Sequence, residues 1–160
     1  MELAKDPFPT VPTVLYIDDE AGNRVAFHAA FRTECNLMVA SGLEEAWHLL
    51  KKGGVHIVIC DQRMPGILGT EALRRIKEGF PQVRRMLITA HADLQALVDA
   101  LNEAGVCHYI QKPWEEAEVR RAVAKAWASV QADQERAAYT ERLAESNRQM
   151  EFALRQYLLS

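Results

Sequence analysis

The sequence predicts an α/β protein in which five parallel strands form a doubly wound sheet with helices on both faces. Five short segments rich in Val, Ile, Leu and Tyr alternate with longer segments whose apolar residues recur at helical spacing. Three of the strand segments are nearly continuous apolar runs, as in strands buried on both sides. Glycine or proline follows the second, third and fourth helical segments, where helices commonly end.

The strands are expected at residues 13–18, 37–40, 56–61, 84–88 and 107–110, where β-branched, aromatic and other apolar residues gather. Strands that alternate with helices imply right-handed crossovers and a parallel sheet. The commonest five-stranded version has the order 2-1-3-4-5. Its ligands bind at the carboxyl ends of the strands, where the order reverses between the first and third strands.

Four helices are expected between the strands, each with an apolar stripe. The stripes are Phe27, Ala30 and Phe31; Leu43, Ala46, Trp47 and Leu50; Leu73, Ile76 and Phe80; and Leu94, Leu97, Val98 and Leu101. Expected helix ends are marked by Gly53 and Gly54, by Gly79 with Pro81, and by Gly105. A fifth helical stretch begins at Pro113.

The fifth helix is expected to be unusually long, because neither Gly nor Pro occurs between Trp114 and Leu159. About 45 residues correspond to roughly 68 Å of helix. Its first half can cover the sheet, whereas residues 131–160 carry a heptad seam. The seam residues are Leu143, Asn147, Met150, Leu154 and Tyr157. We expect an N-terminal arm (1–10), an α/β domain (11–130) and a helical extension (131–160). The extension is expected to be a coiled coil or a linker to an output domain, and the alternative is a solvated helix.

The net charge and the cysteine content argue against several classes of function. The net charge of −3 gives no basic field that would attract nucleic acid or an anionic membrane. No apolar run approaches the roughly 20 residues of a membrane span, and the N-terminus lacks a signal core. Cys35, Cys60 and Cys107 lack CxxC spacing. We therefore expect a cytoplasmic protein whose cysteines are small buried residues.

Acidic residues follow two strands that the predicted order makes neighbours. Asp18 and Asp19 end the first strand, and Asp61 ends the third. Three carboxylates so close cannot all stay ionised without compensation, which is either protonation or a cation. An oxygen-only cluster suits Mg²⁺, and no Cys or His stands at a spacing that would favour zinc.

Two further strands bring polar groups to the same edge of the sheet. The fourth ends in Thr89, and Lys112 follows the fifth. With the three carboxylates, this set fits a carboxylate nucleophile that takes up a phosphoryl group. Asp61 would attack phosphorus, Mg²⁺ and Lys112 would neutralise phosphoryl oxygens, and the Thr89 hydroxyl would donate a hydrogen bond to one.

From about residue 11 to residue 130, the chain resembles the receiver domain of bacterial two-component response regulators, whose fold is flavodoxin-like. The motifs are IDDE (17–20), DQRMPG (61–66), ITAHAD (88–93) and YIQKPW (109–114). The resemblance implies that Asp61 accepts phosphate from a histidine kinase or phosphotransfer protein. It implies Mg²⁺ ligation by Asp19, Asp61 and the Arg63 carbonyl, with Asp18 acting through water. Mn²⁺ can substitute for Mg²⁺. The Lys112–Pro113 peptide is typically cis.

The resemblance also implies a switch. Thr89 and Tyr109 match the family's switch pair, which repacks the face made by the fourth helix, fifth strand and fifth helix when the aspartate is phosphorylated. We expect a homodimer through the helical extension, through this face or through both. Arg63 and His91 border the phosphoryl group, and we expect them to affect its hydrolysis. The domain would catalyse only its own phosphorylation and dephosphorylation. Lys112-Pro113-Trp114 resembles a subgroup often coupled to transcriptional ATPase, cyclase or phosphodiesterase modules.

Several alternatives remain at this point. The chain is expected either to be part of a longer regulator, whose long helix controls an output module, or to be a stand-alone phospho-switch. The stand-alone switch would act by docking or dimerisation through its tail. An aspartyl phosphatase would need a D-x-D-like run at the first strand, where Asp18 and Asp19 stand adjacent. A flavodoxin-like nucleotide binder would need a phosphate loop, and none follows that strand.

Overall fold

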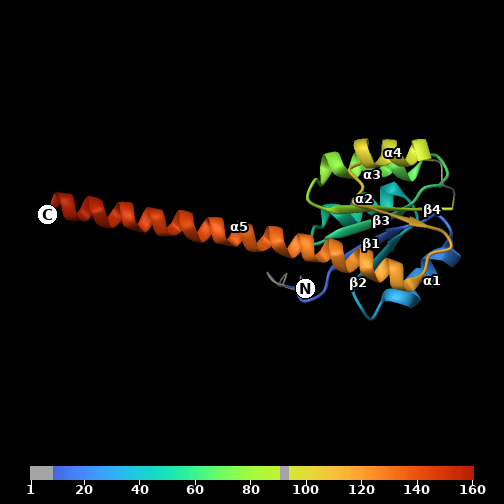
Figure 1. Ribbon diagram of the computed structural model, residues 1–160, viewed down its shortest axis with the longest axis horizontal. Helices are drawn as coiled ribbons and strands as arrows, with labels where there is room; N and C mark the ends of the chain where they lie inside the picture. Colours follow the sequence, from blue (N-terminus) through green and yellow to red (C-terminus); the bar gives the residue numbers. More distant parts are fainter. Residues whose placement is uncertain (1–8, 91–93) are drawn as a thin grey trace. The chain divides into compact units, whose positions relative to one another are not determined.

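The computed structural model describes residues 9–90 and 94–160, except the side chains of residues 94–96, 99 and 100 (Figure 1). The chain divides into two compact units, Met1–Trp127 and Ala128–Ser160. The first unit holds all five described strands and the functional site. The second is the continuation of the last helix. No helix of the described residues is both long enough and apolar enough to cross a membrane.

The sheet consists of β1 (Thr13–Ile17), β2 (Asn36–Ala40), β3 (Ile57–Asp61), β4 (Arg84–Thr89) and β5 (His108–Gln111). All neighbouring strands are parallel, and their order is β2-β1-β3-β4-β5. Each predicted strand is present, with both ends within one residue of the expected position. The predicted fold class is therefore confirmed.

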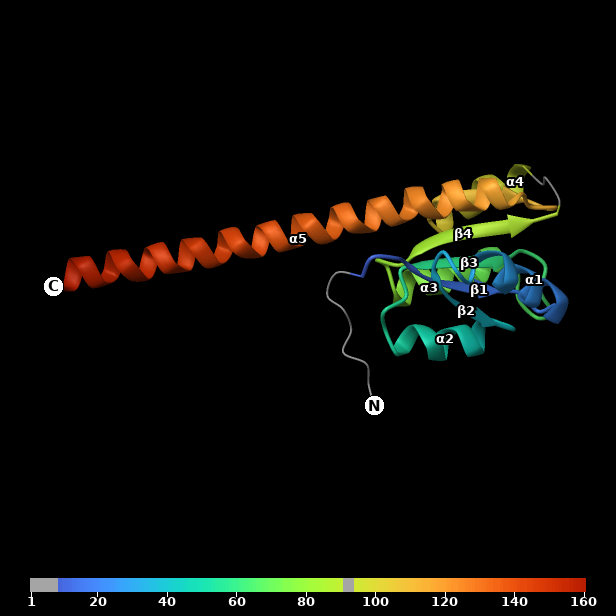
Figure 2. The same cartoon turned by 90° about the horizontal axis from the view of Figure 1, so that it is seen from below.

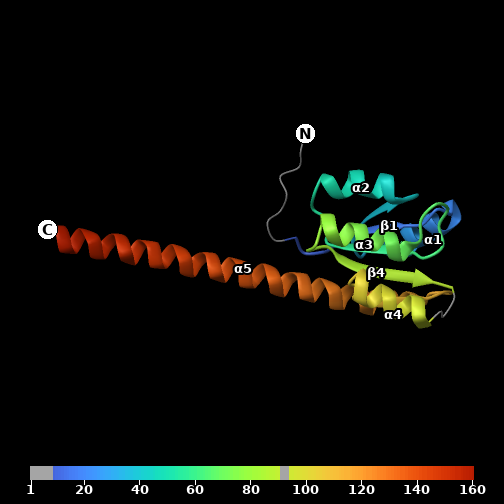
Figure 3. The same cartoon turned by 90° about the horizontal axis from the view of Figure 1, so that it is seen from above.

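Helices lie on both faces of the sheet (Figures 2 and 3). They are α1 (Ala21–Phe31), α2 (Leu43–Lys51), α3 (Gly69–Gly79), α4 (Leu94–Glu103) and α5 (Glu116–Leu159). On one face, side chains of α2 and α3 pack with those of the strands in a continuous core. Its central members are Leu15, Ala46, Leu50, Val58, Leu73, Ile76 and Leu87. On the other face, Phe27 of α1 stacks on Tyr16 of β1.

The helices end where the glycines predicted: α2 and α4 end two residues before Gly53 and Gly105, and α3 ends at Gly79. Gly53, Gly54 and Gly105 have φ values of 76°, 89° and 57°, which only glycine adopts readily. The Lys112–Pro113 peptide is cis, as the resemblance implied. Trp114 contacts Phe27 and Phe31 of α1, with ring centroids 5.5 Å apart in each case. The Trp114 side chain therefore belongs to the packing between α1 and the start of α5.

Two features differ from the expectations. Cys35 and Cys60 are buried, but Cys107, which immediately precedes β5, is exposed. In α4, Val98 and Leu101 are 47% and 45% exposed. The domain therefore covers only part of the apolar stripe of this helix. The side chain of Leu94 lies outside the described part.

Helix α5 continues without a break through the predicted extension to Leu159. Four apolar residues of the seam, Leu143, Met150, Leu154 and Tyr157, are exposed in the single chain. Outside the seam, Arg148 pairs with Glu145 at 2.6 Å. The extension is thus a helix whose large apolar side chains are exposed.

Candidate functional site

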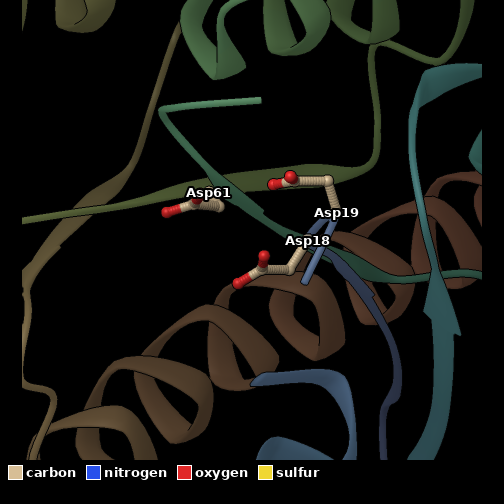
Figure 4. Close-up of side chains that lie close together, drawn as sticks. All are labelled: Asp18, Asp19 and Asp61. Atoms are coloured by element: carbon tan, nitrogen blue, oxygen red, sulfur yellow. The ribbon is translucent and has the colours of Figure 1, made fainter. Parts of the chain in front are cut away.

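Three carboxylates meet where β1 and β3 end (Figure 4). Ile17 pairs with Cys60, so the residues that follow, Asp18 and Asp61, leave adjacent strands at the same level. One oxygen of each of Asp18, Asp19 and Asp61 lies within 4.8 Å of the others. The carboxyl ends of parallel strands share one edge of a sheet, and here this edge coincides with the reversal of strand order. The structure therefore brings together the three acids that the sequence singled out.

Asp18 is fully buried and held by several donors. The Tyr16 hydroxyl donates to its Oδ2 at 2.7 Å, and the amide of Asn23 donates to the same oxygen at 3.1 Å. The backbone N–H of Glu20 donates to Oδ1 at 3.0 Å, while Arg24 binds the Asp18 carbonyl at 2.8 Å. Burial and the bond to Asp18 raise the pKa of Tyr16, so its hydroxyl remains a donor.

Sequence reasoning missed Tyr16, Asn23 and Arg24. A signal existed for Tyr16, because residues two apart on a strand lie on the same face, and Tyr16 precedes Asp18 by two. Asn23 and Arg24 lie in the first turn of α1, which follows the acids directly. Their role could not be read from the sequence because it depends on how α1 begins.

Lys112 provides the positive charge of the site. Its Nζ lies 2.7 Å from Oδ1 of Asp61 and 3.8 Å from Oδ2 of Asp18. Its backbone N–H donates to the Thr89 carbonyl at 2.8 Å, which ties the loop after β5 to the end of β4. Burial raises the pKa of Asp61 although Lys112 opposes the shift. Burial is the largest single influence on Lys112 and disfavours its charge, but the hydrogen bond to Asp61 and the nearby acidic charges together outweigh burial and raise the pKa of Lys112.

The loop after Asp61 folds back tightly onto β3. The backbone N–H of Gly69 donates to the Gln62 carbonyl at 2.8 Å, and the N–H of Thr70 donates to Gln62 Oε1 at 2.9 Å. Gly66 has φ 79°, as a sharp turn requires. A Cβ on Gly69 would collide with the backbone carbonyl of Asp61. Gly69, which sequence reasoning also missed, therefore allows α3 to begin directly against the Asp61 backbone.

The predicted switch residues lie on adjacent strands. Thr89 is buried at the end of β4 and pairs with Gln111 of β5, two residues beyond Tyr109. The Tyr109 hydroxyl is buried and has no hydrogen-bond partner among the described residues. The side chain of Arg63 is exposed, and His91 lies outside the described residues. Thr89, Lys112 and the three acids thus all reach the same edge of the sheet.

Fold and site together define a class of protein: a doubly wound α/β domain with a carboxylate cluster and a lysine at the switch point of its sheet. Residues 14–124 match the family model of the response regulator receiver domain. The chain belongs to this family, as its motifs predicted. Receiver domains are phosphorylated on an aspartate and interact with histidine kinases or phosphotransfer proteins.

Relatives agree with this assignment. The chain is 37% identical over 102 residues to the hydrogenase transcriptional regulatory protein HoxA of Cupriavidus necator, covering 64% of this chain and 21% of HoxA. It is 30% identical over 114 residues to sporulation initiation phosphotransferase F of Bacillus subtilis, covering 70% of this chain and 90% of that protein. The chain thus spans about a fifth of the length of the hydrogenase regulator.

A solved structure shows the same fold. The signal receiver domain of an HD domain-containing protein from Pseudomonas fluorescens superposes with a TM-score of 0.75 at 26% identity. The match covers 85% of this chain and 99% of that structure. The match therefore covers a larger share of the chain than the family model, which spans residues 14–124.

Proposed function

We propose that Asp61 is the phosphoacceptor of this receiver domain. The observation that supports this most strongly is the 2.7 Å contact between Lys112 Nζ and Asp61 Oδ1 inside a cluster of acids. An oxygen of Asp61 attacks the phosphorus of a phosphohistidine on the partner. The P–N bond breaks, the imidazole nitrogen keeps the electron pair, and an acyl phosphate forms on Asp61.

The acid cluster fits a divalent cation. Its donors are all carboxylate oxygens, the set that Mg²⁺ prefers, and three carboxylates carry more charge than Lys112 alone balances. Asp18, Asp19, Asp61 and the Arg63 carbonyl would hold the ion. When bound, Mg²⁺ would supply positive charge to the phosphoryl oxygens. The chain's own Lys112 and Thr89 would bind the same group from β5 and β4.

A phosphatase is the rival function, and the surroundings of Asp18 argue against it. That enzyme would need a nucleophile at the end of β1. Asp18 is fully buried, and three hydrogen-bond donors and Arg24 fix it in place. Asp61 instead contacts Lys112, the group that can neutralise an incoming phosphoryl oxygen. The proposed chemistry is therefore a single self-catalysed transfer followed by slow hydrolysis.

Incubation of the chain with acetyl phosphate, with Mg²⁺ or with excess chelator, tests this proposal. We expect one alkali-labile phosphoryl group per chain, only with Mg²⁺, and peptide mapping should place it on the fragment that contains Asp61. A phosphatase would release phosphate continuously from many esters. Labelling of another fragment, or equal labelling without a divalent ion, would rule out the proposed site.

Phosphorylation would act on the face formed by α4, β5 and α5 through Thr89 and Tyr109. A phosphoryl group adds about −1.5 to −2 charge and three acceptor oxygens, which the Thr89 hydroxyl can approach. The exposed Val98 and Leu101 give this face apolar surface for a partner. A nearly complete switch would require about 5.5 kcal/mol of differential stabilisation between the two states.

We expect Arg63→Ala to shorten the phosphoryl half-life several-fold while the rate of phosphorylation changes little. Arg63 is exposed two residues after Asp61, so its long side chain can obstruct water that approaches phosphorus. The measurement is the decay of labelled protein after removal of the donor. Arg121→Ala, an exposed arginine in α5, is the control. An unchanged half-life in Arg63→Ala would refute this role.

The helical extension is proposed to pair two copies of the chain as a coiled coil. We expect Met150→Arg with Leu154→Arg to convert a dimer to a monomer in sedimentation, because both changes place charge in the seam. Gln149→Arg with Gln156→Arg adds the same charge outside the seam and should leave the dimer intact. Removal of residues 131–160 should also give a monomer. A wild-type monomer at all concentrations would contradict the proposal.

The output of the switch is proposed to be a further module that α5 controls, because the chain matches only about a fifth of HoxA, whose name is that of a transcriptional regulator. A stand-alone switch that docks a partner is the second candidate. The likeness to sporulation initiation phosphotransferase F, 90% of which the match covers, favours it. Reporter activity of the chain fused to an output module, compared with binding by the chain alone, would separate the two.

A further inference from the structure

A buried arginine near the start of β4 takes no part in the acidic site. Arg85 is only 9% exposed, and among the described residues its hydrogen-bond acceptors are all backbone carbonyls. Its Nε donates to Ala104 at 2.9 Å and its Nη2 to Gly105 at 3.4 Å, while its Nη1 donates to Val83 at 2.7 Å and to Pro81 at 3.3 Å. Burying a cation is costly unless it is well bonded, so this arrangement fixes the side chain in place.

Two of these carbonyls immediately follow the last residue of α4. The final carbonyls of a helix have no intrahelical partner and carry partial negative charge, which a cation stabilises. Arg85 thus caps α4, and Lys77 adds a weaker bond to the Glu103 carbonyl at 3.4 Å. Gly105 has φ 57°, and a Cβ there would lie 3.0 Å from Arg85 Nη2. The approach between the guanidinium and the end of α4 is therefore close.

Strand β4 precedes α4 in the chain and is also bonded to the C-terminal end of that helix. Side chains two apart on a strand share a face, so Arg85, Leu87 and Thr89 project to the same side of the sheet. Helix α4 follows Thr89 in the chain and returns to Arg85 at its other end. One end of the helix is therefore linked to the proposed switch residue, and the other is bonded to a side chain four residues earlier on the same strand.

We propose that Arg85 is the fixed pivot of α4: when phosphorylation moves the Thr89 end, the helix tilts about its C-terminal end and does not slide along the sheet. Sliding would separate Ala104 and Gly105 from the guanidinium and leave a buried charge with half its acceptors, which is unfavourable. A tilt about this end preserves the bonds. The inference rests on the proposed phosphorylation of Asp61, and the experiment below separates the two.

The first measurement is amide hydrogen exchange of the full chain without a phosphoryl mimic. In Arg85→Met, exchange in peptides that cover residues 101–106 should rise about tenfold or more, because α4 loses its cap. The control is Arg84→Met, which changes the preceding residue, on the opposite face of β4. Exchange in the same peptides should stay at the wild-type rate in this variant. If Arg85→Met does not fold, Arg85→Lys, which keeps the charge but not the fork, should show a smaller rise in the same peptides. Unchanged exchange in the folded variant would overturn the pivot.

The second measurement adds beryllium fluoride and Mg²⁺ to the wild type. Exchange should change around Asp61, at Tyr109 and in the first half of α4, but not in peptides that cover residues 101–106. In the Arg85 variant, the change should extend into those peptides. An equal change at both ends of α4 in the wild type would overturn the pivot alone. No change anywhere, including around Asp61, would refute both the pivot and the proposed phosphorylation.

Discussion

An Asp61→Asn variant is expected to take up no phosphoryl group from acetyl phosphate with Mg²⁺, under conditions in which the wild type is labelled. The carboxylate is the proposed nucleophile, and a neutral amide cannot form the acyl phosphate. The variant should still fold, because replacing one of three clustered acids relieves repulsion and Lys112 stays 3.8 Å from Asp18. Intact-mass spectrometry measures the uptake directly, and a denaturation curve shows that the variant is folded.

Two controls make this prediction specific to Asp61. Asp19→Asn keeps the nucleophile but removes a proposed metal ligand, so its labelling should recover as the Mg²⁺ concentration is raised. Glu44→Gln removes an exposed acid from the first turn of α2 and should be labelled like the wild type. Labelling of Asp61→Asn at the wild-type level would show that the phosphoryl group goes elsewhere and would overturn the proposed acceptor.

The acid cluster could be predicted because it depends on only two sequence features. The apolar runs located the strands, and the parallel order placed their carboxyl ends on one edge of the sheet. The proximity of Asp18, Asp19 and Asp61 follows directly from these two features. The hydrogen bonds that hold Asp18 could not be predicted in the same way, because they depend on the rotamers of Tyr16 and Asn23 after α1 packs on β1.

Arg85 shows what the hydrophobic pattern of a strand does not predict. The fourth strand begins with two arginines, Arg84 and Arg85, and alternation alone does not say which one points into the domain. The choice depends on the register of β4 beside β3 and on where α4 ends. The exposure of the apolar stripe of α4 could not be predicted for a similar reason. An apolar stripe indicates a helix, but it does not indicate how much of that stripe a neighbouring element covers.

A Phe27→Ala variant is expected to lose about 3–5 kcal/mol of unfolding free energy, as is typical when a buried phenylalanine is removed. Phe27 is 1% exposed and lies at the centre of an aromatic cluster. Its ring stacks on Tyr16 at 4.0 Å between centroids and contacts Phe31 at 4.7 Å and Trp114 at 5.5 Å. Few single changes in the described chain would remove so many ring contacts.

The same variant should also disturb the acidic site, because the Tyr16 ring that Phe27 supports carries the hydroxyl bonded to Asp18. We therefore expect slower labelling from acetyl phosphate even where the variant is folded. Val25→Ala, in the same helix and at a side chain 69% exposed, should change the unfolding free energy by less than about 0.5 kcal/mol and leave labelling unaffected. Urea denaturation at fixed temperature gives both free energies. A loss below about 1 kcal/mol in Phe27→Ala would mean that the ring cluster collapses into the space and does not support Tyr16.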